Sequence, residues 1–171
     1  KNYNINKLGK LGFPLIAKPI SSSGSRGIIF IKNKESLENF LCNNQIDKSF
    51  YILQEFIPHG GAIGYHSLCE SGSVKSRNVH VRLREYPHTG GPSTLRRSGK
   101  NALVEHLSKK ILREVFWTGV SMVEFRIHRD NKLPYLMEVN TRFWGSLSVD
   151  HHSGIDFPSD IINLEVSPRS W

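Results

Sequence analysis

The segment Met137-Glu138-Val139-Asn140-Thr141-Arg142 decides how the fold is interpreted, because polar and apolar residues alternate along it. Successive side chains of a β-strand point to opposite faces of the sheet. Glu138, Asn140 and Arg142 therefore line one face of the predicted strand. Met137 and Val139 line the other face, so the strand has one polar and one apolar side.

A second predicted strand, over residues 120–127, precedes this segment, and the turn residues Asp130-Asn131-Lys132 favour an antiparallel hairpin between the two. In such a hairpin Glu124 lies directly opposite Glu138. Like charges at opposed positions destabilise a sheet, which favours a cation between the two carboxylates. Mg²⁺ prefers oxygen ligands, and Asn140 adds an amide oxygen on the same face. A solvated hairpin face with incidental glutamates is the alternative interpretation.

The composition is that of a globular chain of 171 residues, 38% hydrophobic and 22% charged, enough for one sizeable core or two small ones. No segment approaches the ~20 apolar residues that span a bilayer, and the N-terminus lacks the apolar core of a signal peptide. We therefore expect a cytoplasmic protein without a membrane partner. Cys42 and Cys69 stand alone, which argues against a disulfide framework or a zinc motif and predicts two buried, reduced thiols. The first residue, Lys1, is not Met, so we expect a fragment or a domain of a longer chain.

Basic residues are concentrated in residues 75–100, where seven of them against one acidic residue give a net charge of +6. Such a stretch favours polyanions, either nucleic acid or a polyphosphate ligand. Only one aromatic residue, Tyr86, lies among these positions, whereas a platform that stacks bases would interleave several. The sequence thus favours a polyphosphate ligand over nucleic acid. The basic residues are Lys75, Arg77, Arg82, Arg84, Arg96, Arg97 and Lys100.

Near the N-terminus, residues 2–11 indicate the end of a helix that stops at Gly12. Two short strands follow, Leu15-Ile16-Ala17-Lys18 and Ile28-Ile29-Phe30-Ile31, joined by a Ser/Gly-rich loop. The glycines of this loop precede a strand and not a helix, which excludes a P-loop. Its backbone N–H groups can still approach phosphates, and Lys18, at the end of an apolar strand, is expected to face an anion. A merely flexible hairpin tip is the alternative.

The remaining pattern predicts further strands and helices. We expect a helix over residues 34–44, strands over 51–57, 62–69 and 74–83, a turn at Gly60-Gly61, a long loop over 86–94, a helix over 101–117, a short helical or irregular stretch over 143–152, and a C-terminal helix over 159–164 capped by Asp156. The apolar stripe of the helix over 101–117 is Leu103, Leu107, Ile111, Leu112 and Val115. Asp150-His151-His152 suggests a metal site, but adjacent histidines on a surface turn are more often unliganded.

Taken together, these residues resemble an ATP-grasp domain. The order is a strand ending in Lys18, the loop Gly24-Ser25-Arg26-Gly27, the strand Gln54-Glu55-Phe56-Ile57, then Glu124-Phe125 and Glu138-Val139-Asn140-Thr141-Arg142. The chain is most similar to the branch of the carbamoyl-phosphate synthase large subunit and biotin carboxylase, and especially to its short ligases. The implied fold is α+β, with two α+β subdomains of mainly antiparallel sheets that clasp ATP between them. Residues 1–57 would form the small lid subdomain with the Gly-rich loop and the hinge strand. Residues 58–171 would form the large subdomain with the metal-binding hairpin, incomplete on its N-terminal side.

The resemblance also implies a role for each candidate residue. Mg²⁺, or Mn²⁺ in its place, would be held by Glu124, Glu138 and Asn140, while Arg142 and Arg82 would neutralise the transferred phosphoryl group or the acyl-phosphate. Lys18 would contact the α- and β-phosphates, the Gly-rich loop would close over them, the hinge strand would read the adenine edge, and Met137 would pack on the adenine face. The ATP-binding set is Lys18, Ser23, Gly24, Ser25, Arg26, Gly27, Gln54, Glu55, Phe56, Ile57 and Met137.

The activity implied by the resemblance is that of a ligase. Such an enzyme activates a small-molecule carboxylate as an acyl-phosphate, which an amine- or thiol-type acceptor then attacks. We expect the family's N-terminal domain, which helps to form the acceptor site, to be missing from this chain. Phe143-Trp144-Gly145-Ser146-Leu147 replaces the Val-Glu-His of biotin carboxylases, which argues against bicarbonate and biotin as substrates. A nucleotide-binding module without catalysis and a basic nucleic-acid-binding domain are the two alternatives.

Overall fold

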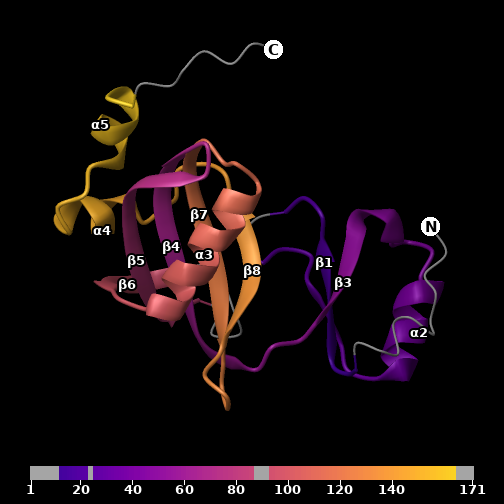
Figure 1. The fold of residues 1–171 in the computed structure, drawn as a ribbon. Coiled ribbons are helices and arrows are strands. Elements are labelled where there is room, and N and C mark those ends of the chain that lie inside the picture. Colours follow the sequence, from indigo (N-terminus) through magenta and orange to yellow (C-terminus); the bar gives the residue numbers. More distant parts are fainter. Residues whose placement is uncertain (1–11, 23–24, 87–92, 165–171) are drawn as a thin grey trace, which may run out of the picture. The chain divides into compact units, whose positions relative to one another are not determined.

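The computed structural model describes residues 12–22, 25–86 and 93–164. They form two compact units, of which the first reaches Ile57 and the second begins at Pro58. Each unit combines helices with an antiparallel sheet, so the expected α+β class is confirmed (Figure 1). The lid and metal-hairpin roles assigned to residues 1–57 and 58–171 stay predictions. Within the described ranges, every helix is too short or too polar to cross a membrane.

The first unit is a three-stranded sheet covered by one helix. Its strands are β1 (Leu15–Pro19), β2 (Ile29–Ile31) and β3 (Tyr51–Glu55), in the order β2-β1-β3. Helix α2 (Lys34–Cys42) and a 3₁₀ turn, η1 (Lys48–Phe50), lie between β2 and β3 along the chain. The predicted hairpin between β1 and β2 is confirmed. Helix α2 begins at Asn33, whose side chain accepts a hydrogen bond from the Ser36 N–H at 2.9 Å, while the Ser36 hydroxyl accepts from the Asn33 N–H. The core consists of Leu15, Ala17, Ile31, Leu37 and Phe40.

The second unit is a five-stranded antiparallel sheet in the order β6-β5-β4-β7-β8. Its strands are β4 (His59–Glu70), β5 (Ser73–Glu85), β6 (Ser93–Gly99), β7 (Gly119–His128) and β8 (Pro134–Asn140). Its helices are α3 (Ala102–Glu114), α4 (Leu147–His152) and α5 (Phe157–Ile162). Helix α5 begins at Asp156, whose carboxylate accepts from the Ser159 N–H at 3.3 Å, as the sequence predicts.

The two faces of this sheet are covered differently. Helix α3 lies across one face (Figure 1), over a core of Tyr65, Cys69, Val79, Val104, Leu112, Val123 and Phe125. On the opposite face, Trp144 and Phe157 pack at one end of the sheet in a cluster with the strand residues Leu68, Val120 and Met122. The other end of that face carries polar and charged side chains, and the candidate site lies there.

Two strand predictions are wrong. Gly60-Gly61 does not form a turn but belongs to β4, where the register shifts between the His59–His128 pair and the Ala62–Arg126 pair. The positive φ of Gly61, 120°, makes such a bulge accessible without strain. Strand β6 is the second difference. Its first residues fall in the predicted loop and the rest were assigned to no element, because the sequence Ser-Thr-Leu-Arg-Arg-Ser-Gly lacks apolar alternation. None of the residues of this edge strand is fully buried, so β6 does not need apolar alternation.

Helix α3 and one cysteine also differ from expectation. The buried stripe of α3 is Val104, Ser108 and Leu112, whereas Leu103 and Val115 are exposed, because they flank the contact line and do not lie on it. Cys42 is exposed, since it lies two positions after the buried Phe40 and therefore on the opposite side of α2. The helix predicted over residues 2–11 lies outside the described residues.

Candidate functional site

The register of the second unit aligns a row of functional residues across four strands. Glu124 on β7 pairs with Glu138 on β8, which confirms the predicted opposition of the two carboxylates. On its other side Glu124 pairs with Gly64 of β4, and Gly64 in turn pairs with His80 of β5. All four positions point to the face that α3 does not cover, because the alternate residues Tyr65, Val79, Val123 and Phe125 form the core beneath α3.

The alternation expected along β8 has one exception, at Met137. The pairs Val123–Val139 and Glu124–Glu138 follow the predicted register, but the next pair is Phe125–Leu136. Met137 therefore has no partner on β7 and forms a β-bulge. The bulge interrupts the period of two at this residue, so simple alternation no longer assigns Met137 to the face of Val139, and that assignment stays a prediction.

Glu124 is the most buried charged group of this row, with 3% of its surface exposed. Arg82 Nη2 donates to Glu124 Oε1 in an ion pair. Burial raises the pKa of the Glu124 carboxyl, Glu138 raises this pKa further, and the Arg82 guanidinium opposes the shift. The cation expected next to the opposed carboxylates of Glu124 and Glu138 is, in this structure, the guanidinium of Arg82.

Glu138 and Asn140 are half-buried and lie next to each other on the same face. Asn140 Nδ2 donates to Glu138 Oε1 at 3.0 Å, which leaves the amide oxygen of Asn140 as a further acceptor. The three predicted metal ligands therefore present carboxylate and amide oxygens from two adjacent strands. This donor set is one that a hard divalent cation takes.

A second group of charges surrounds Arg82. Its Nη1 lies 3.6 Å from Glu85 Oε1, and Glu85 Oε2 is buried without a hydrogen bond, 3.5 Å from His59 Nε2. Arg126 Nη1 donates to His59 Nδ1 at 2.6 Å, so the proton of this neutral ring is on Nε2. Burial and the nearby Arg126 lower the pKa of His59, which keeps the ring neutral and leaves Arg82 shared between Glu85 and Glu124.

Arg142 does not join Arg82. It is exposed, and its Nη1 donates to the Phe143 carbonyl at 3.0 Å. Arg82 instead pairs with Glu124 and lies close to Glu85. The pairing of the two arginines around a phosphoryl group stays a prediction.

The nucleotide-binding candidates of the first unit lie on two strands and a turn. Lys18 is half-buried on β1, opposite Ile52 of β3. Ser25 and Gly27 adopt positive φ angles of 63° and 73°, so the turn at Ser25-Arg26-Gly27 points successive peptide groups in different directions. Ser23 and Gly24 lie outside the described residues.

The hinge candidates follow in the same unit. Gln54 and Glu55 are exposed at the end of β3, next to Ile57. Phe56 donates its N–H to the Pro14 carbonyl at 3.2 Å and places its ring edge-to-face on Phe30, with 5.1 Å between the ring centroids. Their roles toward adenine stay predictions.

The basic stretch does not form one patch. Lys75 pairs with Glu70, Arg77 with Glu105 and Arg82 with Glu124. Tyr65 and Val79 share the α3 side with Arg77, whereas Arg82 lies on the opposite face, because their positions on β5 differ by an odd number. The charges are therefore divided between two faces, which weakens the nucleic-acid interpretation.

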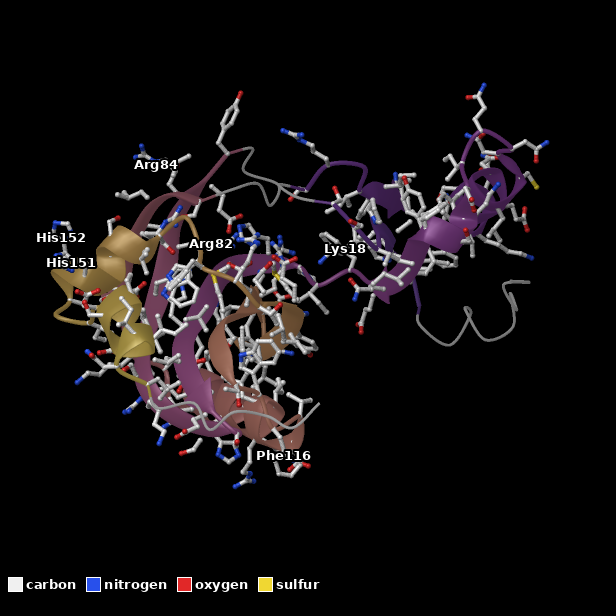
Figure 2. The ribbon with its side chains drawn as sticks, turned by 90° about the horizontal axis from the view of Figure 1, so that it is seen from above. Lys18, Arg82, Arg84, Phe116, His151 and His152 are labelled. Atoms are coloured by element: carbon white, nitrogen blue, oxygen red, sulfur yellow. The ribbon has the colours of Figure 1, made fainter. Side chains whose placement is uncertain are left out.

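The side chains of Asp150, His151 and His152 also point in different directions. His151 and His152 are exposed and project from the outer side of α4 (Figure 2), while Asp150 is fully buried beneath the helix. No group of three or more His, Cys, Asp or Glu side chains among the described residues is arranged to hold a metal ion.

Sequence reasoning missed a buried cluster beside the predicted site, made of His66, His80 and Asp150. His66 Nδ1 lies 2.8 Å from Asp150 Oδ1, and His80 Nδ1 lies 2.7 Å from His66 Nε2. One signal was present in the sequence: His66 lies in a largely apolar strand, and His80 stands between Val79 and Val81. The long separation to Asp150 concealed the connection.

Comparisons with known proteins agree with this fold. A family model described as the ATP-grasp domain matches residues 1–146. The biotin carboxylase domain of Hydrogenobacter thermophilus 2-oxoglutarate carboxylase, solved with MgADP, ADP and bicarbonate, has a TM-score of 0.70 and 20% identity over 96% of this chain and 40% of that chain. Biotin carboxylase from Campylobacter jejuni has a TM-score of 0.74 and 19% identity over 95% of this chain and 39% of that chain.

The fold is also similar to that of a ligase that is not a biotin carboxylase. D-alanine–D-alanine ligase from Bacillus anthracis, solved with ATP, has a TM-score of 0.62 and 21% identity over 95% of this chain and 55% of that chain. The present chain therefore spans about half the length of these proteins or less. No curated protein matches it. Because the family model covers most of its sequence, this chain belongs to the ATP-grasp family.

Proposed function

We propose that this chain is the ATP- and Mg²⁺-binding domain of an ATP-dependent ligase. The observation that carries the proposal is the opposition of Glu124 and Glu138 on adjacent strands, with Asn140 two residues along the same face. Membership of the ATP-grasp family supports the nucleotide, and the neighbours of similar fold were solved with ATP or MgADP.

The oxygen set fits Mg²⁺, and Mn²⁺ would use the same donors. Two carboxylates facing each other, one of them with a raised pKa, concentrate negative charge at this point, and Arg82 offsets part of it. A divalent ion bound to Glu124, Glu138 and Asn140 would neutralise that charge and, with ATP present, would bridge the phosphates. Arg82 would then be released from Glu124 toward the transferred group.

The substrate chemistry proposed is the activation of a carboxylate. Arg82 and Arg142 would stabilise the charge of the transferred phosphoryl group and of an acyl-phosphate, which an amine- or thiol-type acceptor attacks. Because the chain spans about half the length of its structural neighbours or less, we propose that an N-terminal domain of the same enzyme completes the acceptor side. Lys18, the turn at residues 25–27 and the hinge residues would hold the nucleotide. The cytoplasmic location stays a prediction.

Mg·ATP is expected to raise the thermal midpoint of this chain. A ligand that binds only the folded state stabilises it by RT ln(1 + [L]/Kd), and with a Kd of ~1 mM a concentration of ~5 mM contributes about 1 kcal/mol. This corresponds to roughly 2–4 °C for a chain of this size. Thermal melts with Mg·ATP, with Mg²⁺ alone and with ATP plus a chelator measure the shift. Equal midpoints in all three mixtures would contradict the proposal.

Lys18→Ala is expected to remove most of the Mg·ATP-induced shift and to leave the melting transition of the empty protein cooperative. The compact ammonium group is the proposed contact to the phosphates, and Lys18→Arg should fail as well, since a planar guanidinium does not replace it in a confined site. Lys32→Ala, an exposed position that directly follows β2, is the matched control. If the Lys18 and Lys32 variants keep the same ligand-induced shift, Lys18 has no role in nucleotide binding.

The alternative of a nucleotide-binding module without turnover shares all these binding residues. ADP release by a longer chain, across a panel of carboxylates and amines, separates the two functions. Turnover with one acid–amine pair supports the ligase, whereas binding without ADP release in every mixture supports the module.

A further inference from the structure

Asp150 connects helix α4 to the polar face of the five-stranded sheet. Its side chain is fully buried and accepts hydrogen bonds from three donors on different parts of the unit. These donors are His66 Nδ1 at 2.8 and 2.9 Å, Asn78 Nδ2 at 2.8 Å and Trp144 Nε1 at 2.7 Å. Trp144 also stacks on the His66 ring, with 3.9 Å between the ring centroids. The carboxylate and the indole hold this imidazole in one orientation.

The hydrogen bonds fix the tautomers of both histidines. A carboxylate only accepts, so His66 Nδ1 carries the proton and His66 Nε2 is the acceptor. His80 Nδ1, 2.7 Å from that nitrogen, must then be the donor. Neutral His80 is therefore left with an unprotonated Nε2, whose lone pair is available as an acceptor. Burial lowers the pKa of His66, and it lowers that of His80 to about 2, so both rings are neutral.

The ring of His80 lies over Gly64, in the row that leads to Glu124. A Cβ at Gly64 would come within 2.3 Å of His80 Cε1, so the ring occupies the space that a side chain on β4 would fill. Arg82 crosses β4 in the same direction, because it starts two residues further along β5 and reaches Glu124. The imidazole and the guanidinium thus both extend from β5 over β4, and the register row of His80 and Gly64 continues to Glu124 of β7. Arg82 contributes to the low pKa of His80, as expected of neighbouring groups.

The three residues do not form a metal site. Asp150, His66 and His80 follow one another in a line of hydrogen bonds, and each link consumes the lone pair that a metal would need. They are also not among the direct metal candidates, which lie on β7 and β8. Their arrangement is instead that of a carboxylate that orients a first imidazole, which orients a second.

We propose that Asp150, His66 and His80 form a positioning chain that presents the Nε2 lone pair of His80 as a fixed acceptor for the guanidinium of Arg82. The inference rests on the proposed function, since it matters when Arg82 is released from Glu124. A neutral acceptor keeps the guanidinium on this face without cancelling its charge, whereas a carboxylate would neutralise it. Arg82 then stays available for an anionic group of the substrate.

The tautomers are tested directly by ¹⁵N-edited NMR of the imidazole rings in the 171-residue chain. We expect both His66 and His80 to show a protonated Nδ1 and an unprotonated Nε2 at neutral pH, a pattern that is uncommon for free histidine. His80 found with a proton on Nε2, or as a cation, would overturn the inference.

Asp150→Asn tests the direction of the chain. Trp144 Nε1 can only donate, and Asn78 Oδ1 already accepts from the Val79 N–H at 2.9 Å, so His66 is the group that can reverse. The new amide is expected to donate to His66 Nδ1, which moves the protons of both rings to Nε2. His151→Asn, an exposed residue on the same helix, is the control and should leave both tautomers unchanged. Unchanged tautomers in Asp150→Asn would contradict a chain led by this carboxylate.

Glu124→Gln tests the docking of Arg82. Loss of the carboxylate charge should release the guanidinium to His80, which shifts the Nε2 resonance of His80 toward the value of a protonated nitrogen. The double variant Glu124→Gln/Arg82→Met should lack this shift, and Arg84→Met, an exposed neighbour on β5, should not abolish it. A His80 resonance that does not respond to Glu124→Gln would overturn the docking role.

Addition of Mg·ATP to the parent chain separates this inference from the proposed function. The same His80 shift on addition supports both. A shift in Glu124→Gln without any response to Mg·ATP supports the positioning chain and counts against the ATP-binding function.

Discussion

In Glu138→Gln, the Mg²⁺-dependent part of the ATP-induced rise in thermal midpoint is expected to disappear, while the empty protein melts at the same temperature as the parent or higher. Removal of one of the two opposed charges relieves repulsion across β7 and β8, which accounts for the unchanged or raised midpoint. The same removal takes away a ligand of the proposed metal. Melts with and without Mg·ATP measure both effects.

Glu124→Gln should lose the same ligand-induced rise but behave differently when empty. Glu124 is buried and holds Arg82, so its substitution leaves a largely buried guanidinium with Glu85 at 3.6 Å as its remaining carboxylate. Breaking a buried ion pair on one side costs up to about 3–5 kcal/mol. The two glutamates therefore give a matched pair: equal loss of Mg²⁺ dependence with opposite changes in the free energy of unfolding. An unchanged Mg·ATP shift in both variants would remove the metal site and with it the main support for a ligase.

Mild acid is expected to destabilise the second unit steeply. The pKa values of His66 and His80 are lowered by burial, and His80 is also disfavoured as a cation by His66 and Arg82. As the pH falls below about 6.5, the unfolded chain binds protons at these rings but the folded chain does not. Each ring then reduces the free energy of unfolding by about 1.4 kcal/mol per pH unit, or about 2.7 kcal/mol for both. Asp150, which favours a charged His66, reduces this slope.

Glu124 acts in the opposite direction on acidification. Its pKa is raised, so below that value the folded state takes up a proton before the unfolded chain does, which stabilises the fold. Urea denaturation between pH 7 and 5 measures the net slope. His80→Gln keeps a donor for His66 and should reduce the slope by up to about 1.4 kcal/mol per pH unit, while His59, whose pKa is also lowered, keeps its contribution. The exposed His151→Gln should leave the slope unchanged. The same slope in His80→Gln and the parent would mean that His80 does not stay neutral in the folded state.

The hairpin that carries the candidate metal ligands was predictable because its information is local. The turn residues at 130–132 indicate the hairpin and its approximate register, and alternation assigns Glu124 and Glu138 to the polar face. The pairs next to the turn are displaced by one residue from that register, and the bulge at Met137 restores it at Glu138. The cap of α5 at Asp156 is local in the same sense. Both predictions need only neighbouring residues and one rule of geometry.

The positioning chain could not be predicted in this way. His66 and Asp150 are 84 residues apart, and their contact depends on how α4 packs on the sheet after the chain leaves β8. Strand β6 was missed for a related reason: its membership of the sheet is specified by pairing with β5 and not by its own residues. The ion pair of Arg82 with Glu124 also depends on strand order, since Arg82 of β5 must reach across the intervening β4 to β7.

The bulge at Met137 is a position of β8 where a residue can be lost without changing the pairing of its neighbours, which is not the case elsewhere in the strand. Leu136 faces Phe125 and Glu138 faces Glu124, so loss of the residue between them would simply restore an uninterrupted ladder with the same two pairings. Elsewhere in β8, loss or gain of one residue would turn every following side chain to the other face and remove Glu138 and Asn140 from the site. Position 137 can therefore be deleted or exchanged without disturbing the opposed carboxylates, so the proposed adenine contact of this strand can change independently of the proposed metal ligands.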